Sequence, residues 1–360
     1  MTRLFQPLTL RGLTLSNRIA VSPMCQYQAV DGVAQDWHLV HLGGLAQGGA
    51  GLVLTEATAV VPEGRISPDD LGLWNEAQAE SLARIVRFIA AQGAVPGIQL
   101  AHAGRKASNP APWKGSGSLP IEKGGWVPVA PSALAFDTGW TVPTALDEGG
   151  LAAVVQGFVD AARRALAAGF QVVEIHAAHG YLLHQFLSPL SNHREDRYGG
   201  SFENRTRLLR EVVAAVRDGW PERLPLFVRL SATDWVEGGW NLDQSVELAK
   251  ALSDFGVDLV DCSSGGLVPR AEIPLGPGYQ VPFAARIRAE AGLATGAVGL
   301  ITDPEQAEAI LAQGSADLVL LGRELLRDPR WPLHAAQALK AETPWPASYA
   351  RAARGPVAVR

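Results

Sequence analysis

The feature that most constrains the fold is a series of short apolar runs that recurs along the 360-residue chain. Each run is rich in aliphatic residues, which follow one another almost without interruption instead of alternating with polar ones. A strand that is buried on both faces of a parallel sheet has this pattern. We therefore predict eight parallel strands, at residues 18–21, 51–55, 95–100, 172–176, 226–230, 259–262, 294–298 and 318–321.

Longer segments with helical periodicity lie between these runs. Several of them stop just before a glycine, such as Gly169 or Gly256, as helices often do when the next residue is left-handed. Strands and helices that alternate along a whole chain are typical of α/β folds with a parallel sheet. The predicted helices include residues 75–92, 151–168, 203–218, 242–255 and 304–313.

Eight strand–helix units favour a closed (β/α)8 TIM barrel, which needs about 250 residues. Three additions account for the rest: a β-hairpin around Arg11–Gly12, a long excursion after the third strand at residues 102–149, and a C-terminal tail at 342–360. No linker divides the chain, so we expect one domain over residues 1–360. An open doubly wound sheet is the competing architecture, but its usual Gly-x-Gly-x-x-Gly turn is missing.

Composition excludes several classes of protein. With 47% hydrophobic residues the chain can form a large core, and a net charge of −5 argues against a nucleic-acid partner. No apolar stretch approaches the roughly 18 residues of a membrane span, and we find no secretory signal, so we expect a cytoplasmic protein. Two cysteines, Cys25 and Cys262, are too few for a disulfide scaffold, a four-cysteine zinc site or an iron–sulfur cluster.

Polar residues gather just after the predicted strands, where barrels of this kind have their active sites. Only the sixth strand end, at residues 263–266, carries no obvious chemical group. This concentration is the strongest sign of an active site. The groups are Ser22, Pro23, Met24, Cys25 and Tyr27 after the first strand, Glu56 and Ala57 after the second, Gln99, His102, Arg105 and Lys106 after the third, His176, His179 and Tyr181 after the fourth, Arg229 in the fifth, Gly299 after the seventh, and Gly322 with Arg323 after the eighth.

The seventh and eighth strand ends predict a phosphate site. Gly322 and Arg323 stand at the start of a short helix, whose first N–H groups can bind an anion, and Gly299 leaves room for it. The alternative is a turn glycine beside a surface arginine. Arg229, inside an apolar strand, needs a bound anion or a carboxylate from another strand end, because an unpaired buried charge is costly. Cys25, taken alone, is most simply an inert small residue.

His176 and His179 allow three interpretations. They could bind a metal, although a third ligand would be needed and Glu174 is expected to point away from the barrel interior if His176 points inward. They could be structural residues at a strand–helix turn. They could also be two N–H donors that converge on a substrate oxygen, with Tyr181 nearby as a proton donor.

Taken in order, these strand-end residues resemble the Old Yellow Enzyme family of FMN-dependent ene-reductases, and most closely its thermophilic-like branch, which has a cysteine after the first strand. The resemblance covers nearly the whole chain and includes SPMCQY, IQLAHAGRK, EIHAAHGYLLHQF, VGLIT and DLVLLGRELLRDPRWP. It implies FMN that is bound tightly but not covalently. The residues that would contact FMN are Ser22, Pro23, Met24, Cys25, Ala57 and Gln99 at the ring, Arg229 at its N1/O2 edge, and Gly299, Gly322 and Arg323 at the phosphate.

The resemblance also implies a reaction. NADPH, or NADH, would reduce the flavin, whose N5 would pass a hydride to the β-carbon of an α,β-unsaturated carbonyl compound or nitroalkene. His176 and His179 would hold the substrate oxygen, and Tyr181 would protonate the α-carbon. Cys25 and Tyr27 would adjust the flavin potential and contact the substrate.

Helix faces and the tail favour a homo-oligomer, a dimer or a tetramer. In the branch that the chain resembles, an arginine from a neighbouring subunit's tail often reaches the site. Tyr349 and Arg351 resemble that element, so Arg351 is expected to bind substrate. Lys106 matches the family, but no role is assigned to it. The alternatives to an ene-reductase are a non-catalytic barrel and a metal-dependent one with His176 and His179 as ligands; we expect no metal.

Overall fold

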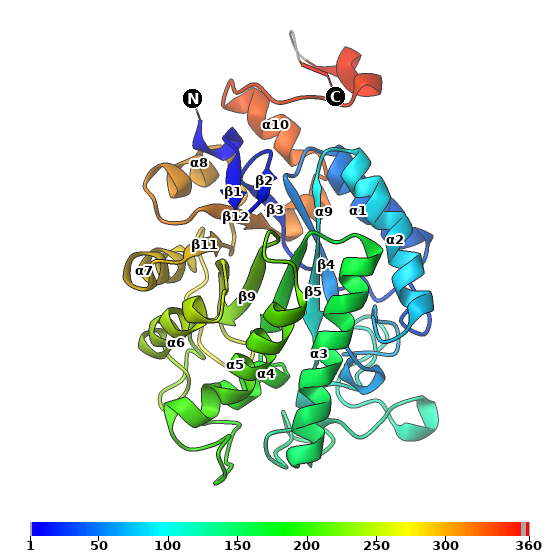
Figure 1. Ribbon diagram of the computed structural model, residues 1–360, viewed down its shortest axis with the longest axis vertical. Coiled ribbons are helices and arrows are strands. Elements are labelled where there is room, and N and C mark those ends of the chain that lie inside the picture. Colours follow the sequence, from blue (N-terminus) through cyan, green and yellow to red (C-terminus); the bar gives the residue numbers. More distant parts are fainter. Residues whose placement is uncertain (1, 354–357, 360) are drawn as a thin grey trace.

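The computed structural model describes residues 2–353, 358 and 359. Eight parallel strands close into a barrel in the order β10-β11-β12-β3-β4-β5-β8-β9, and helices surround it (Figure 1). The predicted (β/α)8 TIM barrel is therefore confirmed. The barrel strands are β3 (Ile19–Val21), β4 (Leu52–Ala59), β5 (Val95–Ala101), β8 (Val172–Ala177), β9 (Leu226–Ser231), β10 (Leu259–Ser263), β11 (Ala294–Ala297) and β12 (Leu318–Leu321).

Polar caps and glycines delimit the helices. Asn75, Ser201 and Asn241, for example, each accept the amide N–H of the third residue on, which satisfies a donor that the first turn leaves free. Gly169 stops its helix at a φ of 96°. The helices are α1 (Asp36–Gln47), α2 (Glu76–Ala91), α3 (Glu148–Ala168), α4 (Leu182–Leu187), α5 (Phe202–Gly219), α6 (Leu242–Asp254), α7 (Val281–Ala291), α8 (Pro304–Ala312), α9 (Arg323–Arg327) and α10 (Trp331–Ala338).

A hairpin closes the amino-terminal end of the barrel, as predicted. Strands β1 (Leu8–Leu10) and β2 (Leu13–Leu15) pair antiparallel around the Arg11–Gly12 turn. Leu8 and Leu15 pack against apolar residues inside the amino-terminal end of the barrel, including Phe227. The other part of the core lies between the strands and the surrounding helices.

The second barrel strand is longer than predicted. The sequence indicated residues 51–55, but β4 runs from Leu52 to Ala59. Its register with β5 shifts between Leu54 and Ala57, as at a β-bulge. A bulge redirects side chains at the rim of a barrel, and it places Glu56 and Ala57 within the strand instead of after it.

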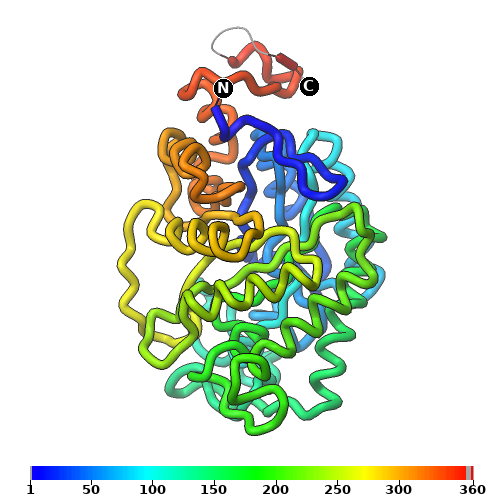
Figure 2. The backbone as a smooth tube through the Cα atoms, turned by 60° about the vertical axis from the view of Figure 1, so that its left-hand side comes forward, coloured from blue at the N-terminus to red at the C-terminus, as the bar shows by residue number. Residues whose placement is uncertain are grey.

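The excursion after β5 and the tail lie at opposite ends of the molecule (Figure 1). The excursion contains two short 3-10 helices, η3 (Gly104–Lys106) and η4 (Ile121–Lys123), and a two-stranded sheet of β6 (Val129–Ala130) and β7 (Thr144–Ala145). The tail contains η5 (Ala347–Ala352). Figure 2 shows the tail again beside the N-terminal segment. In the part of the chain that the structure describes, no helix is long and apolar enough to cross a bilayer.

Candidate active site

The predicted site residues meet at the carboxyl ends of the strands. The register places Ala57 beside Gln99, and His176 beside Arg229. Strands β3 and β9 stand on opposite sides of the barrel, yet Arg229 Nη2 donates a hydrogen bond of 3.1 Å to Ser22 Oγ, just after β3. This bond spans the barrel mouth, so strands far apart in the sequence share one polar centre.

Two buried carboxyl groups, those of Glu174 and Asp261, interact electrostatically with Arg229. Glu174 Oε1 accepts a hydrogen bond of 2.7 Å from Gln99 Nε2, and Asp261 Oδ2 lies 2.9 Å from Arg229 Nε. Residues two apart on a strand face the same side of the sheet. Glu174 therefore points into the barrel together with His176, and the prediction that it points away is wrong.

Arg229 thus has the carboxylate partner that its burial requires, even without a bound anion. Burial raises the pKa of Glu174, the charge of Asp261 raises it further, and Arg229 opposes both effects. Burial likewise raises the pKa of Asp261 against the lowering effect of Arg229. Sequence analysis did not single out either acid as part of the site, because each lies within an apolar strand and not at its end.

His176, His179 and Tyr181 form an aromatic cluster after β8. The ring centroid of His176 lies 5.1 Å from that of His179 and 5.1 Å from that of Tyr181, both edge to face. His176 Nδ1 accepts the Ala178 N–H at 3.3 Å, so a neutral ring carries its proton on Nε2. His179 has a left-handed φ of 58°, and its Nε2 lies 2.7 Å from Ser263 Oγ.

The cluster is uncharged at neutral pH. Burial, followed by the charge of Arg229, lowers the pKa values of His176 and His179 well below their usual value. Burial raises the pKa of Tyr181 well above its usual value, although His179 and Tyr181 keep some surface exposed. Two neutral imidazoles and a phenol can donate hydrogen bonds to an oxygen and supply a proton.

Lys106 holds the same cluster from another side. Its Nζ donates hydrogen bonds of 2.9 Å to the carbonyl oxygens of His179 and Gly266 and lies 5.1 Å from the ring centroid of Tyr181. Burial lowers the pKa of Lys106 to about 8. Gly266 and Ser263 belong to the sixth strand end, so the expectation that this end carries nothing useful is wrong. Its contributions are a hydroxyl and a backbone carbonyl, which sequence alone does not reveal.

A buried contact between Glu56 and His38 holds the segment after β3. Gln26 N–H donates to Glu56 Oε2 at 2.7 Å, and Glu56 Oε1 lies 3.1 Å from His38 Nε2. Burial raises the pKa of the Cys25 thiol well above its usual value, and the nearby acids Asp70 and Glu56 add to this effect. Cys25 is therefore a neutral thiol at pH 7 and not a thiolate nucleophile.

Tyr27 and Pro23 complete this segment. Tyr27 has a left-handed φ of 54°, and its ring meets that of Trp113, in the excursion, edge to face at 5.7 Å. Burial raises the pKa of Tyr27, so its phenol keeps its proton. Pro23 and Met24 are partly exposed. The segment thus presents a sulfur, a thiol and a phenol beside the barrel mouth.

The seventh and eighth strand ends enclose a cavity of about 160 Å³, lined in part by Gly299, Gly322, Arg323 and Arg327. At Gly299, with a φ of 119°, an added Cβ would lie only 2.7 Å from Gln280 Nε2, so a side chain would be both strained and crowded. An added Cβ at Gly322 would lie 3.6 Å from Met24 Sδ. The cavity therefore adjoins the segment after β3.

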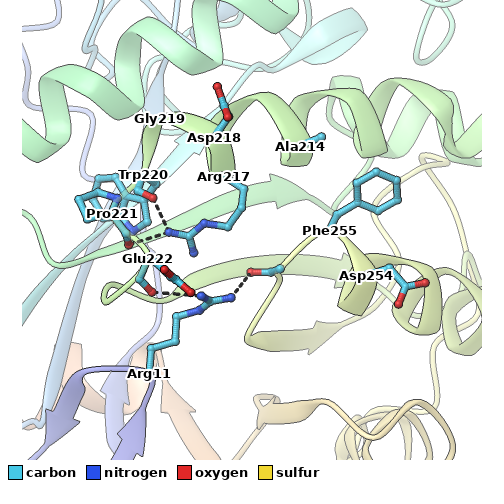
Figure 3. Close-up of a pocket in the computed structure, with 11 residues that line it drawn as sticks. Arg11, Ala214, Arg217, Asp218, Gly219, Trp220, Pro221, Glu222, Asp254 and Phe255 are labelled. Atoms are coloured by element: carbon cyan, nitrogen blue, oxygen red, sulfur yellow. Dashed lines mark hydrogen bonds between the residues drawn. The ribbon is translucent and has the colours of Figure 1, made fainter.

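A larger cavity, of about 690 Å³, lies at the other end of the barrel (Figure 3). Its two arginines already have partners. Arg11 donates to the Glu222 and Gly256 carbonyls, and Arg217 donates to the Trp220 carbonyl at 2.6 Å. The predicted strand-end residues are not among those that line this cavity, so we do not assign the active site there.

Within the described residues, no group of three or more His, Cys, Asp and Glu side chains could hold a metal ion. The tail is also separate from the cluster. The guanidinium carbon of Arg330 lies 4.7 Å from the ring centroid of Tyr349, and the tail lies at the hairpin end of the molecule (Figure 1). The tail that carries Arg351 thus does not lie beside the strand-end cluster of the same chain (Figure 1).

Comparisons with known proteins agree with the barrel fold. The family described as NADH:flavin oxidoreductase / NADH oxidase matches residues 3–342. The NADPH dehydrogenase of Geobacillus thermodenitrificans (strain NG80-2) is 50% identical over 352 residues, 97% of this chain and 98% of that protein. The structure of morphinone reductase matches with a TM-score of 0.79 and 29% identity, over 99% of this chain and 94% of that one.

A 2-naphthoyl-CoA reductase matches with a TM-score of 0.86 and 25% identity, over 93% of this chain but 52% of that one, so the chain spans about half of that enzyme. The match to the family model, at residues 3–342, includes every strand of the barrel. The chain belongs to the NADH:flavin oxidoreductase / NADH oxidase family, the oxidoreductases that include the old yellow enzymes.

Proposed function

We propose that this chain binds FMN and uses NADPH to reduce activated C=C bonds in α,β-unsaturated carbonyl compounds and nitroalkenes. The observation that carries the proposal is the neutral cluster of His176, His179 and Tyr181, which stands at the same barrel mouth as a buried cation and a small cavity lined by arginines. The NADPH dehydrogenase relatives support NADPH as the reductant, and NADH is the alternative.

The residues at the barrel mouth fit FMN. The cavity at Gly299, Gly322 and Arg323 suits a phosphate, because it combines glycine backbone with a cationic side chain. Ser22 links this cavity to Arg229, since Ser22 Cβ would lie 3.9 Å from a Cβ at Gly322 and Ser22 Oγ is hydrogen-bonded to Arg229. A ligand with a phosphate at one end and a polar ring at the other matches this layout.

Bound FMN would supply hydride transfer, from NADPH to the flavin and from flavin N5 to the β-carbon of the substrate. The chain would supply its environment. Arg229 would place positive charge at the N1/O2 edge, while Gln99, Ala57, Ser22, Pro23, Met24 and Cys25 would line the ring. Cys25 and Tyr27 would tune the potential, and Tyr27 would also contact the substrate.

The chain's own chemistry would act on the substrate oxygen and the α-carbon. The N–H groups of His176 and His179 would polarise the carbonyl or nitro oxygen, and because both rings are neutral, they would do so without adding a fixed charge. The Tyr181 hydroxyl would then donate its proton to the α-carbon. A positioned proton donor of this kind contributes about 10²–10⁴-fold to the rate.

Three further points belong to the proposal. FMN binds tightly and non-covalently, the protein acts in the cytoplasm on small molecules, and the chain forms a dimer or tetramer. In that assembly Arg351 of one copy contacts the substrate in the site of another. The position of the tail at the hairpin end of its own barrel supports a contact between copies and not within one (Figure 1).

An absorption experiment tests the proposal. The purified protein is reconstituted with FMN, freed of excess cofactor, and treated anaerobically with NADPH and then with cyclohexenone. We expect a flavin band that bleaches with NADPH and returns with the enone. Bleaching without return would point to a different oxidant. If no flavin stays bound, the proposal fails, and metal analysis would then test His176 and His179 as ligands.

A further inference from the structure

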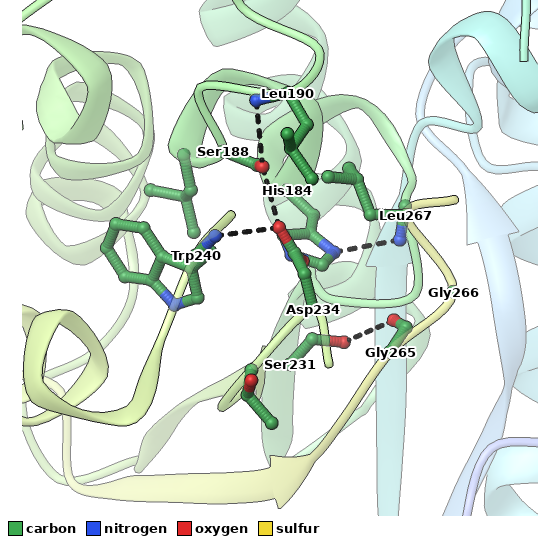
Figure 4. A network of polar contacts seen from close by, with 12 residues as sticks. His184, Ser188, Leu190, Ser231, Asp234, Trp240, Gly265, Gly266 and Leu267 are labelled. Atoms are coloured by element: carbon green, nitrogen blue, oxygen red, sulfur yellow. Dashed lines mark hydrogen bonds and ion pairs between the residues drawn. The ribbon is translucent and has the colours of Figure 1, made fainter. Parts of the chain in front are cut away.

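A buried network that the proposed reaction does not use holds the conformation of the His179–Tyr181 turn. Figure 4 shows the part of this network around His184 and Asp234. His179 and Gly180 are both left-handed, with φ values of 58° and 72°. A left-handed histidine is uncommon and persists where its surroundings hold it in place. Lys106 holds one side of this turn through the His179 carbonyl.

The other side of the turn is held by His184. Gly180 N–H donates a hydrogen bond of 2.9 Å to His184 Nδ1. A ring nitrogen that accepts a hydrogen bond carries no proton, so the proton of His184 must be on Nε2. His184 is completely buried, so no water can replace this partner from outside.

Asp234 selects this protonation state of His184. Its Oδ1 lies 2.9 Å from His184 Nε2, and the carboxylate therefore favours the tautomer with the proton on Nε2. Its Oδ2 accepts hydrogen bonds from Ser188 Oγ at 2.6 Å and from Trp240 N–H at 2.8 Å. Burial acts to raise the pKa of Asp234, but His184 and these hydrogen bonds together keep it below the usual value.

We infer that Asp234 and His184 are positioning residues: Asp234 fixes the tautomer of His184, and His184 Nδ1 holds Gly180 so that His179 and Tyr181 face the substrate. The inference rests on the proposed function of those two side chains. The same logic applies wherever a carboxylate orients a histidine through one ring nitrogen so that the other can act.

Asp234→Asn tests the inference with little change in shape. The amide has only one oxygen, which Trp240 N–H and Ser188 require, so its NH2 group turns to His184 Nε2. The His184 proton then moves to Nδ1 and opposes Gly180 N–H. Phenol serves as the probe, because its oxygen would take the place of the substrate oxygen between His176 and His179. We expect the variant to bind phenol about tenfold more weakly in the FMN-loaded enzyme, because one hydrogen bond that orders the site is lost. Hydrogen exchange in residues 178–183 should accelerate, while FMN affinity and the rate of flavin reduction by NADPH stay unchanged.

Ser245→Ala is the matched control. Its hydroxyl accepts from Trp240 Nε1 at 2.7 Å, so the variant loses a buried hydrogen bond nearby without touching the carboxylate of Asp234. Its phenol affinity should stay within about twofold of wild type, as for a change remote from the site. If Asp234→Asn does not fold, His184→Asn and His184→Gln provide the test. The His184→Asn side chain keeps an acceptor near the Nδ1 position, which faces Gly180 N–H, whereas that of His184→Gln keeps one near the Nε2 position. The His184→Asn enzyme should therefore bind phenol more tightly than the His184→Gln enzyme.

The outcomes separate this inference from the proposed function. If the wild-type enzyme fails to bind phenol, the proposed role of His176 and His179 in binding the substrate oxygen is wrong, and the positioning role is wrong with it. If wild-type enzyme binds phenol and Asp234→Asn binds it equally well, only the positioning role is overturned. Unchanged exchange in residues 178–183 would overturn the role as well. Equal phenol affinity of the two His184 variants would do the same.

Discussion

Two ends of one strand show how the barrel divides its tasks. On β10, Leu259 faces the barrel interior at the amino end of the strand, in the same apolar cluster as Leu8 and Leu15 of the hairpin. Asp261, two residues later, faces the same interior and pairs with Arg229. Ser263, another two residues on, lies 2.7 Å from His179. One strand thus passes from apolar packing to a buried ion pair to the candidate site, and stability and chemistry occupy different layers of the same barrel.

The largest effect is expected at the carboxyl end. Tyr181→Phe removes the proposed proton donor and keeps the ring, so reoxidation of the flavin by an enone should slow by about 10²–10⁴-fold. Flavin reduction by NADPH should change little, which stopped-flow absorbance of each half-reaction would show. Tyr198→Phe is the control, because that hydroxyl bonds Glu211 outside the site. Equal slowing of both half-reactions would remove Tyr181 as the acid.

At the amino end, a change should affect stability and spare the chemistry. Leu15 is 1% exposed. Leu15→Ala would leave a cavity between the hairpin and the barrel interior, which lowers the free energy of unfolding by about 2–5 kcal/mol. Urea unfolding followed by tryptophan fluorescence would measure this loss. The enone step of the folded variant should match wild type. A slower enone step at full FMN occupancy would show that the two ends are not independent.

A buried acid near the site should give stability a smaller, pH-dependent term. Burial raises the pKa of Asp70 to about 7, although Ser67 Oγ donates to it at 2.6 Å. Because the folded state holds this proton more tightly than the unfolded chain, stability falls as the pH rises from about 4 to about 7. The slope is at most about 1.4 kcal/mol per pH unit for one proton.

Asp70→Asn should flatten this dependence, because an amide does not titrate. Urea unfolding of the cofactor-free protein at several pH values between 4 and 8 would compare the two slopes. Parallel curves for the variant and wild type would mean that Asp70 is ionised throughout this range and that its burial is offset by its hydrogen bonds.

The barrel was predictable because its signal is local. Near-continuous apolar runs and glycines at helix ends are repeated features, and each unit confirms the next. The strand ends were less certain: β4 was predicted to stop at residue 55 but extends to Ala59, since a bulge lets it continue through Glu56. Composition around a strand end does not reveal a bulge, which depends on the neighbouring strand.

The candidate site was predictable only in part. His176, His179, Tyr181 and Arg229 stand out because polar groups beside apolar strands are unusual and are grouped at the strand ends. Glu174 was assigned to the wrong face, although the two-residue period of a strand already places it with His176. Ser263 and Lys106 could not be assigned, because their partners are a histidine side chain and backbone carbonyls brought together by the fold.

The sequence by itself determined the barrel, the hairpin and the identity of the polar groups at its mouth, because periodicity and spacing act between near neighbours in the chain. Only the tertiary structure decided which groups pair: Gln99 with Glu174, Arg229 with Asp261, and His184 with Asp234. These partners are separated by tens of residues in the chain and meet because the barrel closes. Their pairing sets the charge and tautomer of the site, since a buried polar group takes its protonation state from the atoms that surround it.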